Sequence, residues 1–279
     1  MIAPSSLPEN FIQWNAKHGA PFGRSSVWRE RLLPHSLYEK YRGPFAIQGN
    51  NTSREFEYPW AFYATPLTAG QRVLEIGGGL SGLQFVLEQE GCKVVNVDPG
   101  MEAKGVGWPC DINSMNKLNR LFGTSVDLRN TVITEADLKP ESFDRVFSIS
   151  VLEHLADDDI EQAMECAFTC LIPGGYFILT VDLSLDVVPF TTRQVNVYGK
   201  NVDIKWLISI APFSLFQGNP RELYGFAEFQ PDFIQSNLSS YLIGRGYPTL
   251  TQCFVLQKPV KEYNGAGCQL QNMKEGKPI

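Results

Sequence analysis

The clearest indication of the fold is the stretch VLEIGGGLSG, residues 73–82. It joins a short apolar run, expected to form a β-strand, to a turn with Gly77, Gly79 and Gly82 and then to a helix. Glycines at this spacing let the backbone come close to a dinucleotide or another adenosine-containing ligand. Glycines carry no charge, whereas Glu75, two residues before Gly77, does. The identity of the ligand therefore depends on this acid.

Apolar runs without alternation recur through the central part of the chain. Because such strands are buried on both faces, they are expected to be parallel and joined by crossover helices. The central stretch is therefore predicted to form a doubly wound α/β sheet. The expected strands are residues 72–76, 93–98, 131–138, 143–150 and 176–182. One helix is expected directly after the glycines, and two more over residues 111–122 and 157–171.

The sequence on either side of this sheet predicts further parts. The N-terminal part is rich in aromatic residues and includes a helix over 26–41, and a final helix over 230–247 precedes a strand within 249–260. The long segment between core and final helix is expected to have a functional role, because such excursions are more often functional than idle. The predicted parts are an N-terminal helical extension 1–68, the α/β core 69–182, an inserted cap 183–230, the final helix and strand 231–262 and a polar tail 263–279.

Composition excludes several classes of partner. The chain has 279 residues, of which 43% are hydrophobic, and a net charge of −6. An acidic chain disfavours duplex nucleic acid and anionic membranes, because both attract clustered Lys and Arg. The N-terminus lacks the basic and apolar regions of a secretory signal, so a cytoplasmic location is expected. Three histidines and six cysteines without a Cys-x-x-Cys pair predict no metal site.

Glu75 separates two kinds of adenosine ligand. A carboxylate about 4 Å from a phosphate opposes it by roughly 4 kcal/mol at an effective dielectric constant of 20. S-adenosylmethionine instead brings a sulfonium and an ammonium group, which the same carboxylate attracts. Asp98 ends the second expected strand, where an acid can hold both ribose hydroxyls. A turn-forming role before Pro99-Gly100 is the alternative for Asp98.

Four segments in order make the resemblance specific. VLEIGGG (73–79), VVNVDPG (94–100), SFDRVFSISVLEHL (142–155) and LIPGGYFILTVD (171–182) resemble the motifs of class I S-adenosylmethionine-dependent methyltransferases. The resemblance implies a Rossmann-like, seven-stranded, mostly parallel sheet with an antiparallel last strand, and S-adenosylmethionine as cofactor. The cofactor-binding positions that it implies are Glu75, Gly77, Gly78, Gly79, Asp98, Glu135, Ala136 and Ser150. Asp111 is a competing candidate near adenine, with helix capping as its other role.

Methyl transfer is an in-line displacement whose main requirement is alignment in a dry pocket. His154, in the EH pair after the fourth strand, is the candidate general base, and packing or capping is its alternative role. Some quinone-pathway members of the resembling family bind a divalent ion through an acid three residues before this pair, where this chain has Ser150. Metal dependence is therefore not expected. The candidate acceptor contacts are Asp182, Arg193 and Tyr198.

The sequence therefore predicts a methyltransferase acting on oxygen, nitrogen or carbon of a small-molecule acceptor. An NAD-dependent oxidoreductase is an alternative, against which Glu75 and the absence of a Tyr-x-x-x-Lys pair after the fourth strand argue. A non-catalytic scaffold with this fold is a third possibility, against which the intact glycines, Glu75 and Asp98 argue. The acceptor and the oligomeric state cannot be read from the sequence.

Overall fold

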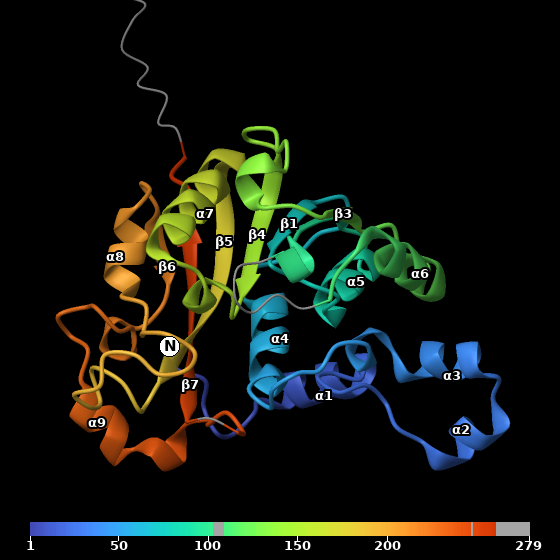
Figure 1. The fold of residues 1–279 in the computed structure, drawn as a ribbon, viewed down its shortest axis with the longest axis horizontal. Coiled ribbons are helices and arrows are strands. Elements are labelled where there is room, and N and C mark those ends of the chain that lie inside the picture. Colours follow the sequence, from blue (N-terminus) through green and yellow to red (C-terminus); the bar gives the residue numbers. More distant parts are fainter. Residues whose placement is uncertain (103–108, 247, 261–279) are drawn as a thin grey trace, which may run out of the picture.

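A single seven-stranded sheet organises the chain (Figure 1). The computed structural model describes residues 1–102, 109–246 and 248–260. The strand order is β3-β2-β1-β4-β5-β7-β6, in which β1 to β5 are parallel and β7 runs antiparallel to both its neighbours. The strands are β1 (Arg72–Ile76), β2 (Lys93–Val97), β3 (Asp127–Arg129), β4 (Phe143–Ile149), β5 (Leu171–Ser184), β6 (Ser214–Gln217) and β7 (Thr249–Gln257). The predicted seven-stranded, mostly parallel sheet is confirmed.

Helices cover both faces of the sheet, as its apolar strands require. Neighbouring residues of β1 show the pattern, because Val73 packs into the cluster under α1, α4, α5 and α6, and Leu74 packs into the cluster under α7 and α8. Both side chains are fully buried. The helices are α1 (Glu9–His18), α4 (Arg54–Tyr63), α5 (Gly82–Gln89), α6 (Ile112–Phe122), α7 (Asp157–Cys170) and α8 (Ile204–Ser209). The sheet is thus doubly wound.

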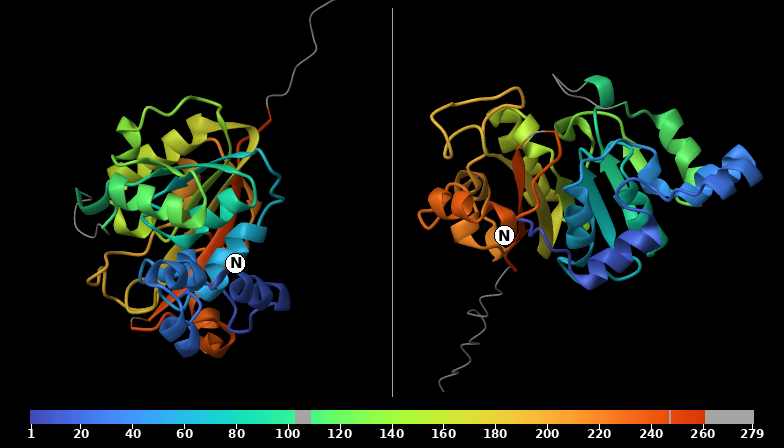
Figure 2. Two further views of the ribbon diagram at one scale, coloured as in Figure 1. Left: turned by 90° about the vertical axis from the view of Figure 1, so that its right-hand side faces the viewer. Right: turned by 90° about the horizontal axis from the view of Figure 1, so that it is seen from below.

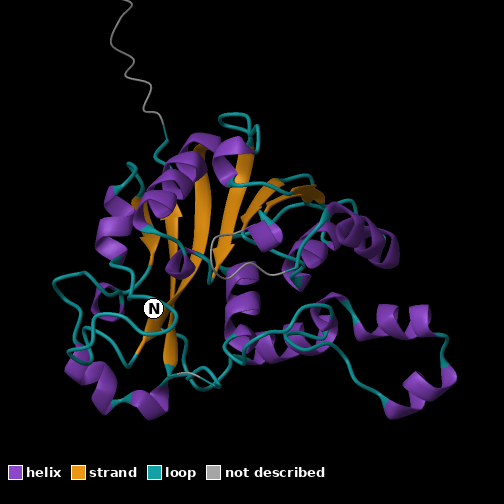
Figure 3. Cartoon of the chain, in the orientation of Figure 1, coloured by secondary structure: helices purple, strands orange, loops and turns teal. Residues whose placement is uncertain are grey.

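The N-terminal part reaches the carboxyl ends of the central strands. Helix α4 stands directly beyond the ends of β4 and β5 (Figure 3). Two short helices, α2 (Val27–Leu32) and α3 (His35–Arg42), project away from the sheet (Figure 2). The expectation of one helix over 26–41 was wrong, because Pro34 separates the two and its ring excludes it from a helix interior. The N-terminal extension therefore packs against the ends of the central strands.

The third strand lies earlier than predicted. Residues 131–138 hold no strand; Ile133–Glu135 is a 3₁₀ helix (η3), and β3 is Asp127–Arg129. An edge strand of three residues buries only Leu128, so it leaves almost no apolar signal in the sequence. The apolar pair Val132 and Ile133 gave the misleading signal, although Val132 is 45% exposed.

The segment predicted as a cap, 183–230, is partly core. It contains α8, whose Ile204 and Leu207 are fully buried, and the edge strand β6. Exposed residues alternate along β6, which hid it among loop residues. In place of the expected helix over 230–247, the structure has α9 (Pro231–Ser236) and a 3₁₀ turn (Leu238–Ser240). The helix does not continue because the backbone N–H of Leu242 donates to the carbonyl of Ala3. The last strand is confirmed as β7.

The remaining expectations concern the ends of the chain. The predicted tail 263–279 lies outside the described residues. Within the parts that are described, none of the helices combines the length and apolar character needed to cross a bilayer.

Candidate active site

The turn between β1 and α5 requires its glycines. Gly77 and Gly79 have φ values of +68° and +55°, in the left-handed region that side chains disfavour. A Cβ at Gly77 would lie 2.6 Å from Cγ1 of Val151, and one at Gly79 would lie 2.7 Å from Oε1 of Gln48. The turn therefore packs against the segment after β4 on one side and the N-terminal extension on the other.

Polar side chains of β2 hold this turn in place. Buried Asn96 accepts the N–H of Gly78 at 3.2 Å and donates to the carbonyl of Gly79 at 2.9 Å. Asp98 accepts the N–H of Gly79 through Oδ2 at 2.7 Å and that of Gly100 through Oδ1 at 2.6 Å. Asp98 therefore does form the turn before Gly100, and it also lies against the glycines, where a ribose-binding acid is needed. The sequence analysis missed Asn96, whose signal is a polar residue inside an apolar strand.

Glu75 is buried beside the glycines and is incompletely paired. Its exposed fraction is 2%. Oε1 accepts a hydrogen bond from the Ser81 hydroxyl at 3.2 Å, whereas Oε2 has no partner among the described residues. Burial raises the pKa of Glu75 to about 8, with Ser81 opposing the shift and Asp98 adding to it. A buried carboxylate oxygen without a partner fits a cationic ligand group, which would satisfy the oxygen and favour its charged form.

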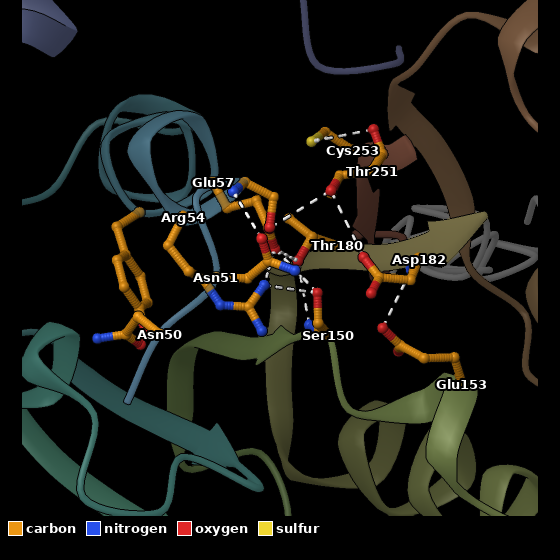
Figure 4. Close-up of polar contacts among 12 residues, drawn as sticks. Asn50, Asn51, Arg54, Glu57, Ser150, Glu153, Thr180, Asp182, Thr251 and Cys253 are labelled. Carbon is orange, nitrogen blue, oxygen red and sulfur yellow. Dashed lines mark hydrogen bonds and ion pairs between the residues drawn. The ribbon is translucent and has the colours of Figure 1, made fainter. Parts of the chain in front are cut away.

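The second polar cluster lies at the ends of β4, β5 and β7 (Figure 4). Arg54, at the start of α4, donates through Nη1 to Glu57 and to the hydroxyl of Ser150, the latter at 2.7 Å. Fully buried Glu57 also accepts from Ser150 at 2.9 Å and from Thr180 at 2.8 Å. Burial opposes ionisation, yet Arg54 and the hydroxyl donors hold the pKa of Glu57 below its ordinary value. Sequence reasoning missed both Arg54 and Glu57.

Beside this cluster, the segment after β4 meets the end of β5. Oε1 of Glu153 accepts the backbone N–H of Asp182 at 3.0 Å, and its buried Oε2 has no hydrogen-bond partner in the described parts of the chain. Burial raises the pKa of Glu153 to about 7, and burial together with Glu153 raises that of Asp182 well above its ordinary value. His154 is exposed, and desolvation by its surroundings lowers its pKa despite Asp182. The structure thus brings Asp182 next to the EH pair.

The other predicted site residues are more dispersed. Ala136 is buried after η3, and Glu135 is exposed and accepts a hydrogen bond from Thr131 at 3.0 Å. Arg193 and Tyr198 lie in an exposed loop, where Arg193 pairs with Asp186 at 3.4 Å.

Asp111 caps α6. Its Oδ1 accepts the backbone N–H groups of Asn113 and Ser114 at 2.8 and 2.9 Å, which confirms the capping role.

Comparison with known proteins identifies the class of domain. Residues 74–179 match the family described as the methyltransferase domain. With the motif order and the sheet topology, this match confirms the predicted resemblance over residues 74–179, which are similar to the domain of class I S-adenosylmethionine-dependent methyltransferases. The family match over these residues agrees with the enzyme class and the cofactor that the resemblance implies.

Among curated proteins, the chain is similar to O-methyltransferases. The chain is 32% identical over 123 residues to the ubiquinone biosynthesis O-methyltransferase of Rhizobium etli, covering 44% of this chain and 45% of that protein. It is 38% identical over 89 residues to the protein of the same name from Hahella chejuensis, covering 32% and 34%. The chain thus spans less than half the length of these relatives that it matches.

Solved structures share the fold. The crystal structure of the [4+2]-cyclase SpnF has a TM-score of 0.53 at 14% identity, over 81% of this chain and 92% of that one. The YcgJ protein from Bacillus subtilis has a TM-score of 0.51 at 12% identity, over 73% and 98%. At these identities the similarity extends to the fold alone.

Proposed function

We propose that this chain transfers a methyl group from S-adenosylmethionine to a hydroxyl oxygen of a small-molecule acceptor. The observation that carries the proposal is the unpaired, buried Oε2 of Glu75 beside glycines that require positive φ. A pyrophosphate there would meet a carboxylate with no cation beside it. A sulfonium-bearing amino acid would satisfy the carboxylate.

The same residues account for the rest of the cofactor. Asp98 lies against the turn and keeps lone pairs on both oxygens for ribose hydroxyls. Glu135 and Ala136 follow β3 in the chain, and the proposal assigns them to the adenine end of the cofactor. Ser150 has φ +49° and its N–H is taken by the carbonyl of Thr180, so its contribution to the methionine end would come from its own carbonyl.

Bound S-adenosylmethionine supplies the activated methyl group, and the chain supplies alignment and exclusion of water. Arg54, Glu153 and Asp182 lie close together near the carboxyl ends of β4 and β5 (Figure 4), and the proposal assigns the acceptor to this side. Oxygen as the methylated atom is supported by the name O-methyltransferase of the curated relatives and by the carboxyl groups that can take up a hydroxyl proton.

We propose that the reaction needs no metal ion. Ser150 stands where some quinone-pathway enzymes have an acidic ligand, and here its hydroxyl contacts the guanidinium of Arg54. The cation in contact with this position is therefore a side chain of the protein, Arg54, which is also paired with Glu57. Among the described residues no group of three His, Cys, Asp or Glu side chains is placed to hold an ion.

Isothermal titration of the purified chain with S-adenosylmethionine, S-adenosylhomocysteine and NADH tests the proposal. We expect both sulfur ligands to bind and NADH not to bind. Tight binding of NADH would favour the oxidoreductase instead. Methyl release with phenol and catechol as probe acceptors then distinguishes an enzyme from a non-catalytic scaffold, since the scaffold would release none with any acceptor.

A further inference from the structure

We propose that Glu153, through Oε2, is the proton acceptor for the hydroxyl group that becomes methylated. This inference rests on the proposed function and assigns the proton to the acid of the EH pair, where the sequence analysis assigned it to the histidine. The observations that carry it are the hydrogen bonding of the carboxyl group, its place in the segment whose Val151 contacts the glycine turn, and the charges around it.

The carboxyl group of Glu153 is fixed at one oxygen and free at the other. Oε1 accepts the N–H of Asp182, a donor that belongs to β5 and cannot rotate. Oε2 is buried and, within the described residues, lacks a partner. Figure 4 shows the side chain extending toward the end of β5. A buried acceptor without a donor is costly for folding alone, so its retention favours a role in binding or chemistry.

The segment that contains Glu153 starts in contact with the glycine turn. Val151 approaches Gly77 so closely that a Cβ on the glycine would overlap it. Glu153 follows two residues later in the 3₁₀ turn η4 (Leu152–His154). The carboxyl ends of adjacent parallel strands lie at one edge of the sheet, so Glu153 lies at the same edge as the glycines.

Charged groups on three elements surround Glu153. Asp182 of β5 is its carboxyl neighbour, α4 contributes Arg54 and Glu57, and η4 contributes His154. Arg54 and Glu57 form an ion pair and largely offset each other. Burial raises the pKa of both carboxyl groups, that of Glu153 to about 7. A base with that property works well at physiological pH.

His154 is placed differently. It is exposed, whereas Oε2 of Glu153 is buried beside the strand ends. A base in contact with bulk water gains no advantage from the dry pocket that alignment requires. His154 is therefore assigned to the rim of the crevice.

The proton balance is complete. The acceptor oxygen forms its bond to the methyl carbon, the carbon–sulfur bond breaks with its electron pair going to sulfur, and the hydroxyl proton moves to Oε2 of Glu153. The carboxylic acid then releases the proton to water when the product leaves. No oxidant, reductant or further reactant is needed.

Glu153→Gln tests the inference with little structural change, because the amide oxygen can still accept the N–H of Asp182. We expect kcat to fall by about 10²–10⁴-fold, with KM for the probe acceptor and affinity for S-adenosylhomocysteine unchanged. The acidic limb of the pH profile of kcat near pH 7 should disappear. Glu161→Gln, in an exposed glutamate of α7, is the matched control and should behave as wild type.

A readout without turnover keeps the test independent of the acceptor. Infrared difference spectra of the ligand-free chain should show protonated carboxyl bands from Glu75, Asp182 and Glu153, and the band that titrates near pH 7 should be absent from Glu153→Gln while that of Glu75, near pH 8, stays. Retention of the band that titrates near pH 7, an unchanged rate in Glu153→Gln, or loss of the acidic limb in His154→Gln would overturn the assignment. Failure to bind S-adenosylhomocysteine would instead contradict the proposed function and leave the carboxyl titration to be judged alone.

Discussion

Two buried glutamates, Glu57 and Glu75, show how the two sides of the crevice differ. Glu57 receives hydrogen bonds from Arg54 and three hydroxyl groups, and its pKa is lowered despite full burial. Glu75 receives one hydrogen bond, and burial raises its pKa to about 8. A paired buried carboxylate stabilises the fold. An unpaired one beside a strained turn indicates a ligand that arrives later.

The two sides also differ in how they are assembled. On the cofactor side, Glu75, the glycines, Asn96 and Asp98 come from neighbouring parts of the sequence. On the proposed acceptor side, Glu57 contacts Thr251, 194 residues away, and Ser150, 93 residues away. The first side follows from a local motif, and the second exists only after the sheet and α4 have come together.

Removing the cation that pairs with Glu57 should have the largest effect on stability. Arg54→Met leaves Glu57 buried without its cation, so we expect the free energy of unfolding to fall by about 3–5 kcal/mol in urea denaturation. Arg54→Met combined with Glu57→Gln should recover much of the loss, because the charge that lacks a partner is also removed. Lys17→Met, which breaks the exposed Lys17–Glu90 pair, is the control and should change stability little. Equal losses of stability in Arg54→Met and Lys17→Met would contradict the role given to Glu57.

Gly77→Ala should have the second largest effect and tests the glycine turn beside the unpaired Glu75. Positive φ makes the alanine cost about 1–3 kcal/mol, and its Cβ would displace Val151. We expect affinity for S-adenosylhomocysteine, measured by calorimetry, to fall about tenfold or more. Gly70→Ala is the control, because Gly70 has φ +88° with nothing within 4 Å of the added Cβ. It should lose stability but keep affinity; equal affinity losses in both would mean that strain alone, not the turn, governs binding.

Glu75→Gln tests whether the unpaired glutamate makes stability depend on pH. Because its folded pKa is raised, Glu75 contributes stability that is present below about pH 4.5 and is lost as pH rises through about 8. The free energy of unfolding of the ligand-free wild type should therefore fall more steeply between pH 5 and about 8 than that of Glu75→Gln. Urea denaturation at both pH values measures the two slopes. Parallel slopes would show that Glu75 is ionised without its ligand.

Asp111→Ala should have the smallest effect. Loss of the N-cap of α6 is expected to cost about 1 kcal/mol in thermal or urea unfolding. Affinity for S-adenosylhomocysteine should stay the same, because both hydrogen bonds of Oδ1 go to the helix. A weakened affinity would restore Asp111 as an adenine contact.

The sequence predicted most of the fold but little of the acceptor side. Buried central strands such as β1 and β4 have continuous apolar runs, and their positions were predicted correctly. The edge strands β3 and β6 bury too few side chains to leave such a run, so they were misplaced or missed. Edge strands are specified by pairing with a neighbour, which a local pattern does not encode.

The same reasoning applies to the site. The sequence brought Glu75, the glycines and Asp98 together correctly, because a strand–turn–helix motif fixes their positions. Arg54 and Glu57 stand in an aromatic-rich segment, where their spacing of three residues predicts only a local pair. Their contact with Ser150 and Thr180 depends on how α4 packs on the sheet, and no local feature of the sequence states that packing.

A crystal structure of the chain soaked with S-adenosylmethionine tests the central claim most directly. We expect the positively charged end of the ligand at Oε2 of Glu75 and its ribose at Asp98. A crevice that stays free of this ligand, or that binds a pyrophosphate-bearing nucleotide in its place, would contradict the proposal that the unpaired glutamate selects a cationic methyl donor.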